Sequence, residues 1–209
     1  MMRVIAVDGP AAAGKGTLAR RLAAHFGLPH LDTGLLYRAV ARRVIDAGGD
    51  PADPLAAEAA ARSLHAGDTE RPDLRGPPVD GAASAVAAVP AVRAALLAFQ
   101  RGFAAEDGAV LDGRDIGTVI FPDAAAKLFV FATVAERGRR RWSELAARGE
   151  AAALADITAD LVARDATDAA RRSAPMKPAD DALLLDTTDL DADAAFSRAL
   201  ALLRKAGFE

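Results

Sequence analysis

The stretch VDGPAAAGKGT, residues 7 to 17, has the spacing Gly9-x4-Gly14-Lys15. It lies between an apolar run at 4–7 that predicts a strand and a segment at 17–23 that predicts a helix. A glycine-rich turn in this context directs backbone N–H groups and a helix N-terminus at phosphate, while the lysine adds charge at the β- and γ-phosphates. We therefore expect a nucleoside triphosphate to bind at Gly9, Pro10, Ala11, Ala12, Ala13, Gly14, Lys15, Gly16 and Thr17.

Gly16 follows the lysine, where most such loops carry a serine or threonine that binds magnesium. GKGT resembles the nucleoside monophosphate kinases, and this resemblance implies that phosphates and water hold most of the metal. Asp112 ends the apolar run 109–112 and is the candidate for a contact through water. A water-mediated contact suffices because Mg²⁺ loses its water shell reluctantly. We therefore expect Mg²⁺ as the cofactor and Asp112 beside it, the alternative for Asp112 being a turn cap.

Two stretches near predicted strand ends carry candidates for binding a second phosphate. In LDTGLLYR, residues 31 to 38, Thr33 is expected to cap a helix, and Arg38 could clamp a monophosphate with its planar fork. In LDGRDIGTVIFPDA, residues 111 to 124, Arg114 and Asp115 follow a strand at the carboxyl edge of the predicted sheet. The alternatives are a solvated helix residue for Arg38 and a local ion pair for Arg114 with Asp115.

A third stretch, RDATDAARRSAP at 164–175, spaces Arg164, Asp168 and Arg171 at i, i+4 and i+7. This spacing predicts one helix face. The face is interpreted as part of a lid whose arginines bind phosphate and whose aspartate binds sugar hydroxyls, the alternative being a surface ladder of ion pairs.

Short apolar runs alternate with segments of helical length, which predicts an α/β fold with a parallel sheet covered on both faces. The expected strands lie at 4–7, 30–32, 109–112, 127–132 and 183–186. Two segments interrupt the alternation, at about 48–107 and about 136–178, and we expect both as mobile insertions in one domain over 1–209. The second carries Arg137, Arg140 and Arg141, of which one or more could reach a transferred phosphoryl group.

Composition narrows the classes of function. The net charge of −3 argues against a nucleic acid polymer as partner, and the absence of cysteine excludes disulfides and thiolate metal sites. The three histidines show no ligand spacing and are interpreted as ordinary helix or loop residues. No secretory signal is visible, and the most apolar region, 81–99, is interrupted by Pro90 and Arg93, which makes it a poor membrane span. A cytoplasmic protein without a membrane partner is expected.

Taken in order, GPAAAGKGT, LDTGLLYR, VAAVPAVRAALLAFQR, DGRDIGTVIFPDA, RDATDAARRSAP and ADDALLLDTT resemble the bacterial-type cytidylate kinases over nearly the whole chain. The resemblance implies a P-loop kinase fold, a five-stranded parallel sheet flanked by helices, a nucleoside monophosphate (NMP)-binding insertion at about 48–107 and a lid at about 136–178. It also implies transfer of the γ-phosphoryl group of ATP to CMP or dCMP, within pyrimidine nucleotide metabolism, by a monomer.

The same resemblance implies roles for individual residues. Lys15, Arg114 and Arg171 would be catalytic, and the CMP-binding set would be Thr33, Arg38, Ser84, Arg93, Arg114, Asp115, Arg164, Asp168 and Arg171. A carboxylate at Asp115 would accept from the cytosine amine and reject uracil, which has an acceptor there. The stretch 75–84 before Ser84 is shorter than is usual in the family. The alternatives left open are another acceptor (UMP, AMP or a small alcohol) and a nucleotide-dependent switch protein.

Overall fold

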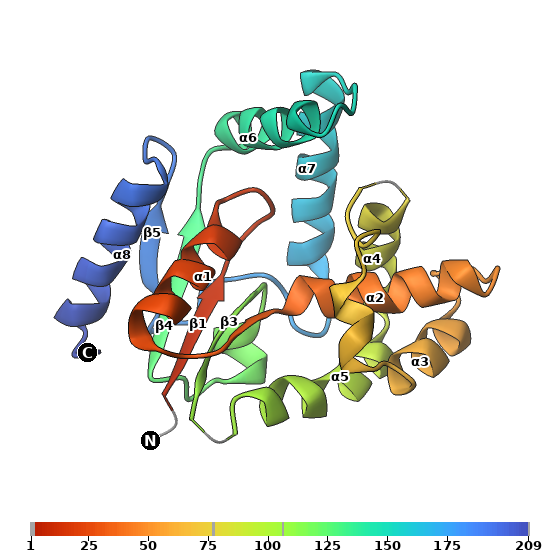
Figure 1. The fold of residues 1–209 in the computed structure, drawn as a ribbon, viewed down its shortest axis with the longest axis horizontal. Helices are drawn as coiled ribbons and strands as arrows, with labels where there is room; N and C mark the ends of the chain where they lie inside the picture. Colours follow the sequence, from red (N-terminus) through yellow and green to blue (C-terminus); the bar gives the residue numbers. More distant parts are fainter. Residues whose placement is uncertain (1–2, 77, 106, 209) are drawn as a thin grey trace. The chain divides into compact units, whose positions relative to one another are not determined.

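The computed structural model describes residues 3–76, 78–105 and 107–208 of the chain (Figure 1). The described residues form two compact units, and each is treated by itself. The first unit comprises residues up to 30 together with those from 107 onward, and the second comprises 31–105. The expected insertion at about 48–107 falls in the second unit except at its end, and the expected lid at about 136–178 falls in the first. Their roles as a substrate-binding insertion and a lid stay predictions.

Five strands form one sheet in the order β2-β3-β1-β4-β5. They are β1 (Val4–Asp8), β2 (His30–Asp32), β3 (Ala109–Gly113), β4 (Ala126–Phe131) and β5 (Leu183–Asp186). The pairings β1–β3, β1–β4 and β4–β5 are parallel, and every residue of β1 and β3 is buried. Burial on both faces explains why these strands are short continuous apolar runs. The predicted α/β class and five-stranded parallel sheet are confirmed, with strand ends within one residue of those expected.

Helices α1 (Lys15–Phe26) and α8 (Ala192–Lys205) contact each other and cover one face of the sheet (Figure 1). Leu18 and Leu22 of α1 and Leu203 of α8 are almost completely buried. They share one apolar core with side chains of β1, β4 and β5, among them Ile5 and Leu128. This packing fixes α1, and with it the glycine-rich loop at its N-terminus, against the central strands.

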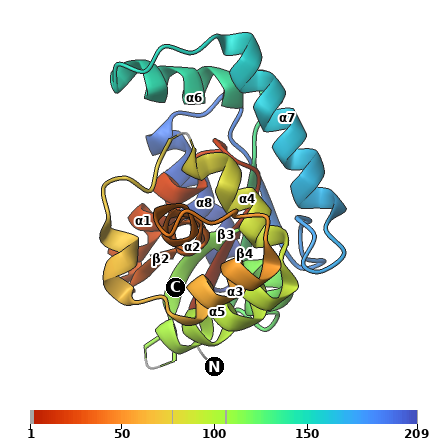
Figure 2. The same ribbon diagram turned by 90° about the vertical axis from the view of Figure 1, so that its right-hand side faces the viewer.

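Helices α6 (Val134–Ala147) and α7 (Leu154–Ala170) form a pair that meets at an angle beyond the carboxyl end of β4 (Figures 1 and 2). Leu145 of α6 packs with Ile157 and Leu161 of α7 in a small separate cluster. The helices approach closely at Gly138, where an added Cβ would lie 2.6 Å from Thr158 Oγ1. The pair therefore has its own packing and does not rely on the main core.

The second unit is helical. It contains α2 (Thr33–Asp46), α3 (Pro54–Arg62), the 3₁₀ turn η1 (Ala66–Glu70), α4 (Val79–Ala88) and α5 (Pro90–Phe103), packed around its own apolar cluster. In the described chain no single helix is long and apolar enough to cross a membrane, and α4 with α5 passes that test only as a pair bent by 95°. The bend falls at Val89, because Pro90 opens α5 as its first helical residue.

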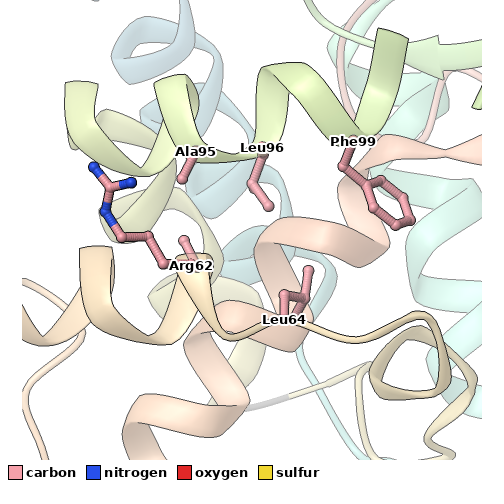
Figure 3. A pocket seen from close by; sticks show the side chains of 6 residues that line it. Arg62, Leu64, Ala95, Leu96 and Phe99 are labelled. Atoms are coloured by element: carbon pink, nitrogen blue, oxygen red, sulfur yellow. The ribbon is translucent and has the colours of Figure 1, made fainter. Parts of the chain in front are cut away.

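A pocket of about 230 Å³ in this unit is lined by Ala61, Arg62, Leu64, Ala95, Leu96 and Phe99 (Figure 3). It lies between α3 and α5, and Arg62 is the charged residue among the six that line it. None of the residues expected to bind nucleotide is among these six.

Gly9, directly after β1, passes against the backbone of β4. Its φ is +144°, and an added Cβ would lie only 1.9 Å from the carbonyl oxygen of Val130. Main-chain atoms in the middle of a parallel sheet cannot move aside cheaply, so only glycine fits. Gly27 offers a contrast, because its φ is +65° and no atom lies within 4 Å of the Cβ position.

We expect Gly9→Ala to lower the free energy of unfolding by at least about 3 kcal/mol, since the clash is with backbone. The control, Gly27→Ala, should cost only about 1 kcal/mol, because it adds a strained φ without a clash. Urea denaturation of both variants measures the difference. Equal losses in the two variants would contradict the crowding at Gly9.

Candidate active site

The glycine-rich loop leads directly into α1, whose first residue is Lys15. Gly14 is the N-cap residue, with a left-handed φ of +84°. Ala12 also has a left-handed φ, +59°, which costs a residue other than glycine about 1–2 kcal/mol. Alternation of right- and left-handed residues turns successive N–H groups toward one side and makes an anion-binding concavity. The left-handed residues Ala12 and Gly14 are compatible with such a site.

Arg137 of α6 connects the α6–α7 pair to this loop. Its side chain is almost completely buried, and Nη1 donates to the carbonyl oxygen of Ala11 at 3.2 Å. Nε donates to the carbonyl of Ala132 at 3.0 Å, and Nη2 pairs with Asp165 of α7 at 2.6 Å. Ala11 also packs against the apolar cluster of α6 and α7. These contacts give Arg137 a role in holding the loop, which its position in an arginine-rich segment did not reveal.

Arg140 makes a second connection, between α6 and the segment after β5. Its Nη1 donates to Thr187 Oγ1 at 3.2 Å, and its Nη2 to the carbonyl of Leu190 at 3.3 Å. The Thr187 hydroxyl in turn donates to the carbonyl of Ala13 at 3.0 Å. A Cβ on Gly14 would lie 3.7 Å from Arg140 Nη1, so this guanidinium borders the loop. Arg141, the third arginine expected to reach the transferred group, pairs with Glu144 at 2.9 Å.

Asp112 lies beside the loop at the residue that follows the lysine. A Cβ on Gly16 would be 3.6 Å from Asp112 Oδ2, and the carboxylate is buried. Carboxylate oxygen is a ligand type that Mg²⁺ prefers, so the residues present fit the ion. The described residues contain no group of three or more His, Cys, Asp and Glu side chains that could hold a metal.

The expectation that His30 is a helix or loop residue is wrong as to its place in the fold. It lies in β2, and its Nε2 is 2.8 Å from Asp112 Oδ1. The bond leaves Oδ2 as the atom nearer to Gly16. His30 and Asp112 are 82 positions apart, and only the pairing order of the strands brings them together.

Asp168 of α7 binds two of the expected phosphate-binding arginines. Arg114 Nε donates to Asp168 Oδ2 at 2.8 Å, and Arg171 Nη2 pairs with Asp168 Oδ1. Asp168 is only 1% exposed, so the surface ladder considered as the alternative is wrong. The prediction that Arg171 shares the helix face is also wrong, because α7 ends at Ala170 and Arg171 is its C-cap residue with ψ 132°. The extended backbone there carries Arg171 back to Asp168.

In the second unit, the prediction that Thr33 caps a helix is wrong. The N-cap residue of α2 is Asp32, and Thr33 is the buried first helical residue. Arg38 of α2 pairs with Asp80 of α4 at 3.0 Å between Nη2 and Oδ1. This ion pair tethers the side chain expected to bind the acceptor phosphate.

Arg93 and Ser84 lie in the same unit. Arg93 is buried in α5, with its guanidinium carbon 5.6 Å from the centre of the Tyr37 ring, and Ser84 is half-buried in α4. In the first unit, Asp115 is buried after β3 and Arg164 is half-buried in α7. The structure thus brings Arg114, Asp168 and Arg171 together directly, whereas the binding role of every site residue stays a prediction.

Asp8, the last residue of β1, is a buried carboxylate for which no function was expected. It is 5% exposed, and its two oxygens accept from the backbone N–H groups of Ile116 and Gly117 at 2.8 and 2.7 Å. Burial raises the pKa of Asp8 from 3.8 to about 7, although the two N–H donors act in the opposite direction. The nearby Asp115 raises this pKa further, and Arg114 lowers it.

A phosphate-binding loop on an α/β sheet, bordered by arginines and a metal-compatible carboxylate, defines a P-loop phosphotransferase. The cytidylate kinase family model matches residues 5–205, and the chain belongs to this family. It is 63% identical over 205 residues to a cytidylate kinase of Granulibacter bethesdensis, covering 98% of both chains. It is 62% identical to a cytidylate kinase of Acidiphilium cryptum, covering 97% of this chain and 95% of that one.

Among solved structures, an uncharacterized protein from Eubacterium ventriosum aligns with a TM-score of 0.58 at 13% identity, covering 96% of this chain and 98% of that one. A likeness at this identity shows a shared fold.

The Asp8 pKa predicts a pH dependence of stability. The folded value, about 7, lies above the ordinary value of 3.8, so the folded state binds the extra proton between these values. The contribution of Asp8 is therefore fully present below about pH 4 and is lost as the pH rises through about 7. Complete loss corresponds to on the order of 4 kcal/mol.

Asp8→Asn removes this titration. We expect the wild type to lose stability relative to the variant between about pH 4 and pH 8, measured by urea denaturation across that range. Ion pairs or backbone hydrogen bonds lower the pKa values of three other carboxyl groups, those of Asp46, Asp68 and Asp73. Their contributions to stability change with pH in the opposite sense, but they are the same in the wild type and the variant. A constant difference in stability across the range would contradict the raised pKa.

Proposed function

We propose that this protein transfers the γ-phosphoryl group of ATP to CMP or dCMP, giving ADP and CDP or dCDP. The observation that carries the proposal is membership of the cytidylate kinase family over residues 5–205, combined with the loop and arginine geometry of the first unit. Both substrates are anions, and this site assembles cationic and N–H donor groups.

The donor polyphosphate would bind the loop at 9–17. The N-terminus of α1 and the loop N–H groups supply fixed positive dipoles, and Lys15 supplies a mobile charge for the β- and γ-phosphates. Arg137 and Arg140 border this loop, and we propose that Arg140 or Arg141 also faces the transferred group.

The acceptor monophosphate would bind Thr33, Arg38, Arg114 and Arg171. A guanidinium has five N–H donors, so Asp168 can orient Arg114 and Arg171 while other donors face a phosphate. Asp168 with Arg164 would hold the sugar. Ser84, Arg93 and Asp115 would read the base, with the Asp115 carboxylate accepting from the cytosine amine.

Mg²⁺ with ATP would be held by phosphate oxygens and water, with Asp112 contacting it through water. The ion would neutralise charge that develops between the phosphates. The acceptor oxygen is already anionic, so the residues need only align the two substrates, neutralise charge and exclude water, without a general base. We further propose that the protein acts as a monomer in the cytoplasm and has neither a membrane nor a nucleic acid polymer as partner.

A panel of acceptors tests the function. With ATP and Mg²⁺, we expect ADP release to be fastest with CMP and dCMP, and roughly tenfold or more slower with UMP and AMP. The readout is kcat/KM for each acceptor, with the phosphorylated product identified by chromatography. Preference for UMP, AMP or a small alcohol would overturn the assignment, and slow ATP hydrolysis without a phosphorylated product would favour a switch protein.

Lys15→Ala tests the mechanism. Removing the charge at the β- and γ-phosphates should lower kcat with CMP by at least about 100-fold, while the fold is retained. The matched control is Lys205→Ala at an exposed site of α8, which should leave kcat unchanged. Steady-state rates for both variants give the comparison, and a nearly normal kcat for Lys15→Ala would refute the mechanism.

A further inference from the structure

Asp8 belongs to the strand that leads into the phosphate loop, yet its side chain serves another segment. In the sheet, Asp8 lies beside Gly113 of β3 and Phe129 of β4. Both carboxylate oxygens accept backbone N–H groups that are 108 and 109 positions away in the sequence. A buried carboxylate is costly unless donors satisfy it, and here two consecutive backbone groups do so.

Those N–H groups open the turn that follows Arg114 and Asp115. The turn, η2 (Ile116–Ile120), has a π-helical pattern in which Ile120 N donates to Asp115 O at 3.2 Å and Phe121 N donates to Ile116 O at 2.7 Å. The first N–H groups of any helical turn have no acceptor within it. Asp115 occupies the N-cap position, but its side chain does not cap the turn. Asp8 therefore supplies the cap from a different strand.

The turn is also held from the β4 side. A Cβ on Gly117 would lie 3.1 Å from Lys127 Cδ and 3.4 Å from Asp8 Oδ2, so both side chains border its backbone. Lys127 is buried, and its ammonium donates to the carbonyl of Pro122 and pairs with Asp181 at 2.8 Å. The backbone on both sides of η2 thus has a fixed position relative to β1 and β4.

We propose that Asp8 is a positioning residue that fixes the backbone at Ile116 and Gly117 and thereby aims the Asp115 side chain at the base of the acceptor. This inference rests on the proposed role of Asp115. A carboxylate discriminates cytosine from uracil only within hydrogen-bond distance of the exocyclic group, so a small shift of the adjacent turn weakens the discrimination. Base selectivity would then depend on a residue that touches no substrate.

The test compares kcat/KM for CMP and UMP in the wild type and in Asp8→Asn. The asparagine oxygen can accept from one N–H group, but its NH₂ group would face the other donor. We expect the CMP-to-UMP ratio to fall at least roughly tenfold. Amide hydrogen exchange at Ile116 and Gly117 should become faster, which is a readout independent of activity.

Three variants make the result specific. Val4→Ala, at a buried residue of the same strand, should lower the melting temperature without changing the ratio. Asp115→Asn should abolish the discrimination directly. Gly117→Ala keeps the Asp8 side chain but adds a methyl group beside its carboxyl group, and should lower the ratio even if Asp8→Asn does not fold.

The outcomes separate the positioning role of Asp8 from the base-reading role of Asp115. If Asp115→Asn abolishes the discrimination but Asp8→Asn and Gly117→Ala keep the ratio within about twofold of the wild type, the positioning role is wrong and the proposed function stands. If Asp115→Asn leaves the ratio unchanged, Asp115 does not read the base and the inference falls with that assignment. A lowered ratio in Val4→Ala would show that general destabilisation explains the effect, which also overturns the inference.

Discussion

Two guanidinium groups repel each other, and this protein holds Arg114 and Arg171 on opposite oxygens of one carboxylate, Asp168. Asp168 is buried, so the attraction is screened little and the trio keeps one net positive charge. The arrangement requires β3 to end next to the C-terminus of α7. It also requires the helix to stop at Ala170, and the returning chain is fixed there by the bond from Met176 N to Asp168 O.

Helices α6 and α7 are linked to the glycine-rich loop by arginines that donate to carbonyl or hydroxyl oxygens rather than to a carboxylate. Arg137 donates to a loop carbonyl, and Arg140 reaches the loop through the Thr187 hydroxyl. The N–H groups of such a loop face phosphate, so carbonyl groups on its other side need donors of their own. Buried arginine and threonine side chains supply these donors, which couples the position of α6 to the shape of the loop.

The sequence alone was sufficient to predict the sheet, the glycine-rich loop and the family, because apolar runs and glycine spacing are local signals. It was insufficient for Asp8, His30 and Arg137, whose partners lie on distant segments that only the strand order and the α6–α7 packing bring close. The wrong prediction that Thr33 caps α2 has a local cause. Asp32 and Thr33 are adjacent and both are residue types that favour the N-cap position, so propensity alone does not show which of them occupies it.

The proposed site for two phosphorylated substrates contains carboxylates of its own, and an unneutralised Asp would repel the phosphates. Here three buried carboxylates of the first unit each have at least one hydrogen-bond or ion-pair partner. Asp168 has two arginines, Asp8 has two backbone N–H groups, and Asp112 has His30 on one oxygen. The other oxygen of Asp112 lies by Gly16. A Cβ at position 16 would make only an ordinary contact with that oxygen, at 3.6 Å, so a side chain there would share the space beside the carboxylate proposed to contact magnesium.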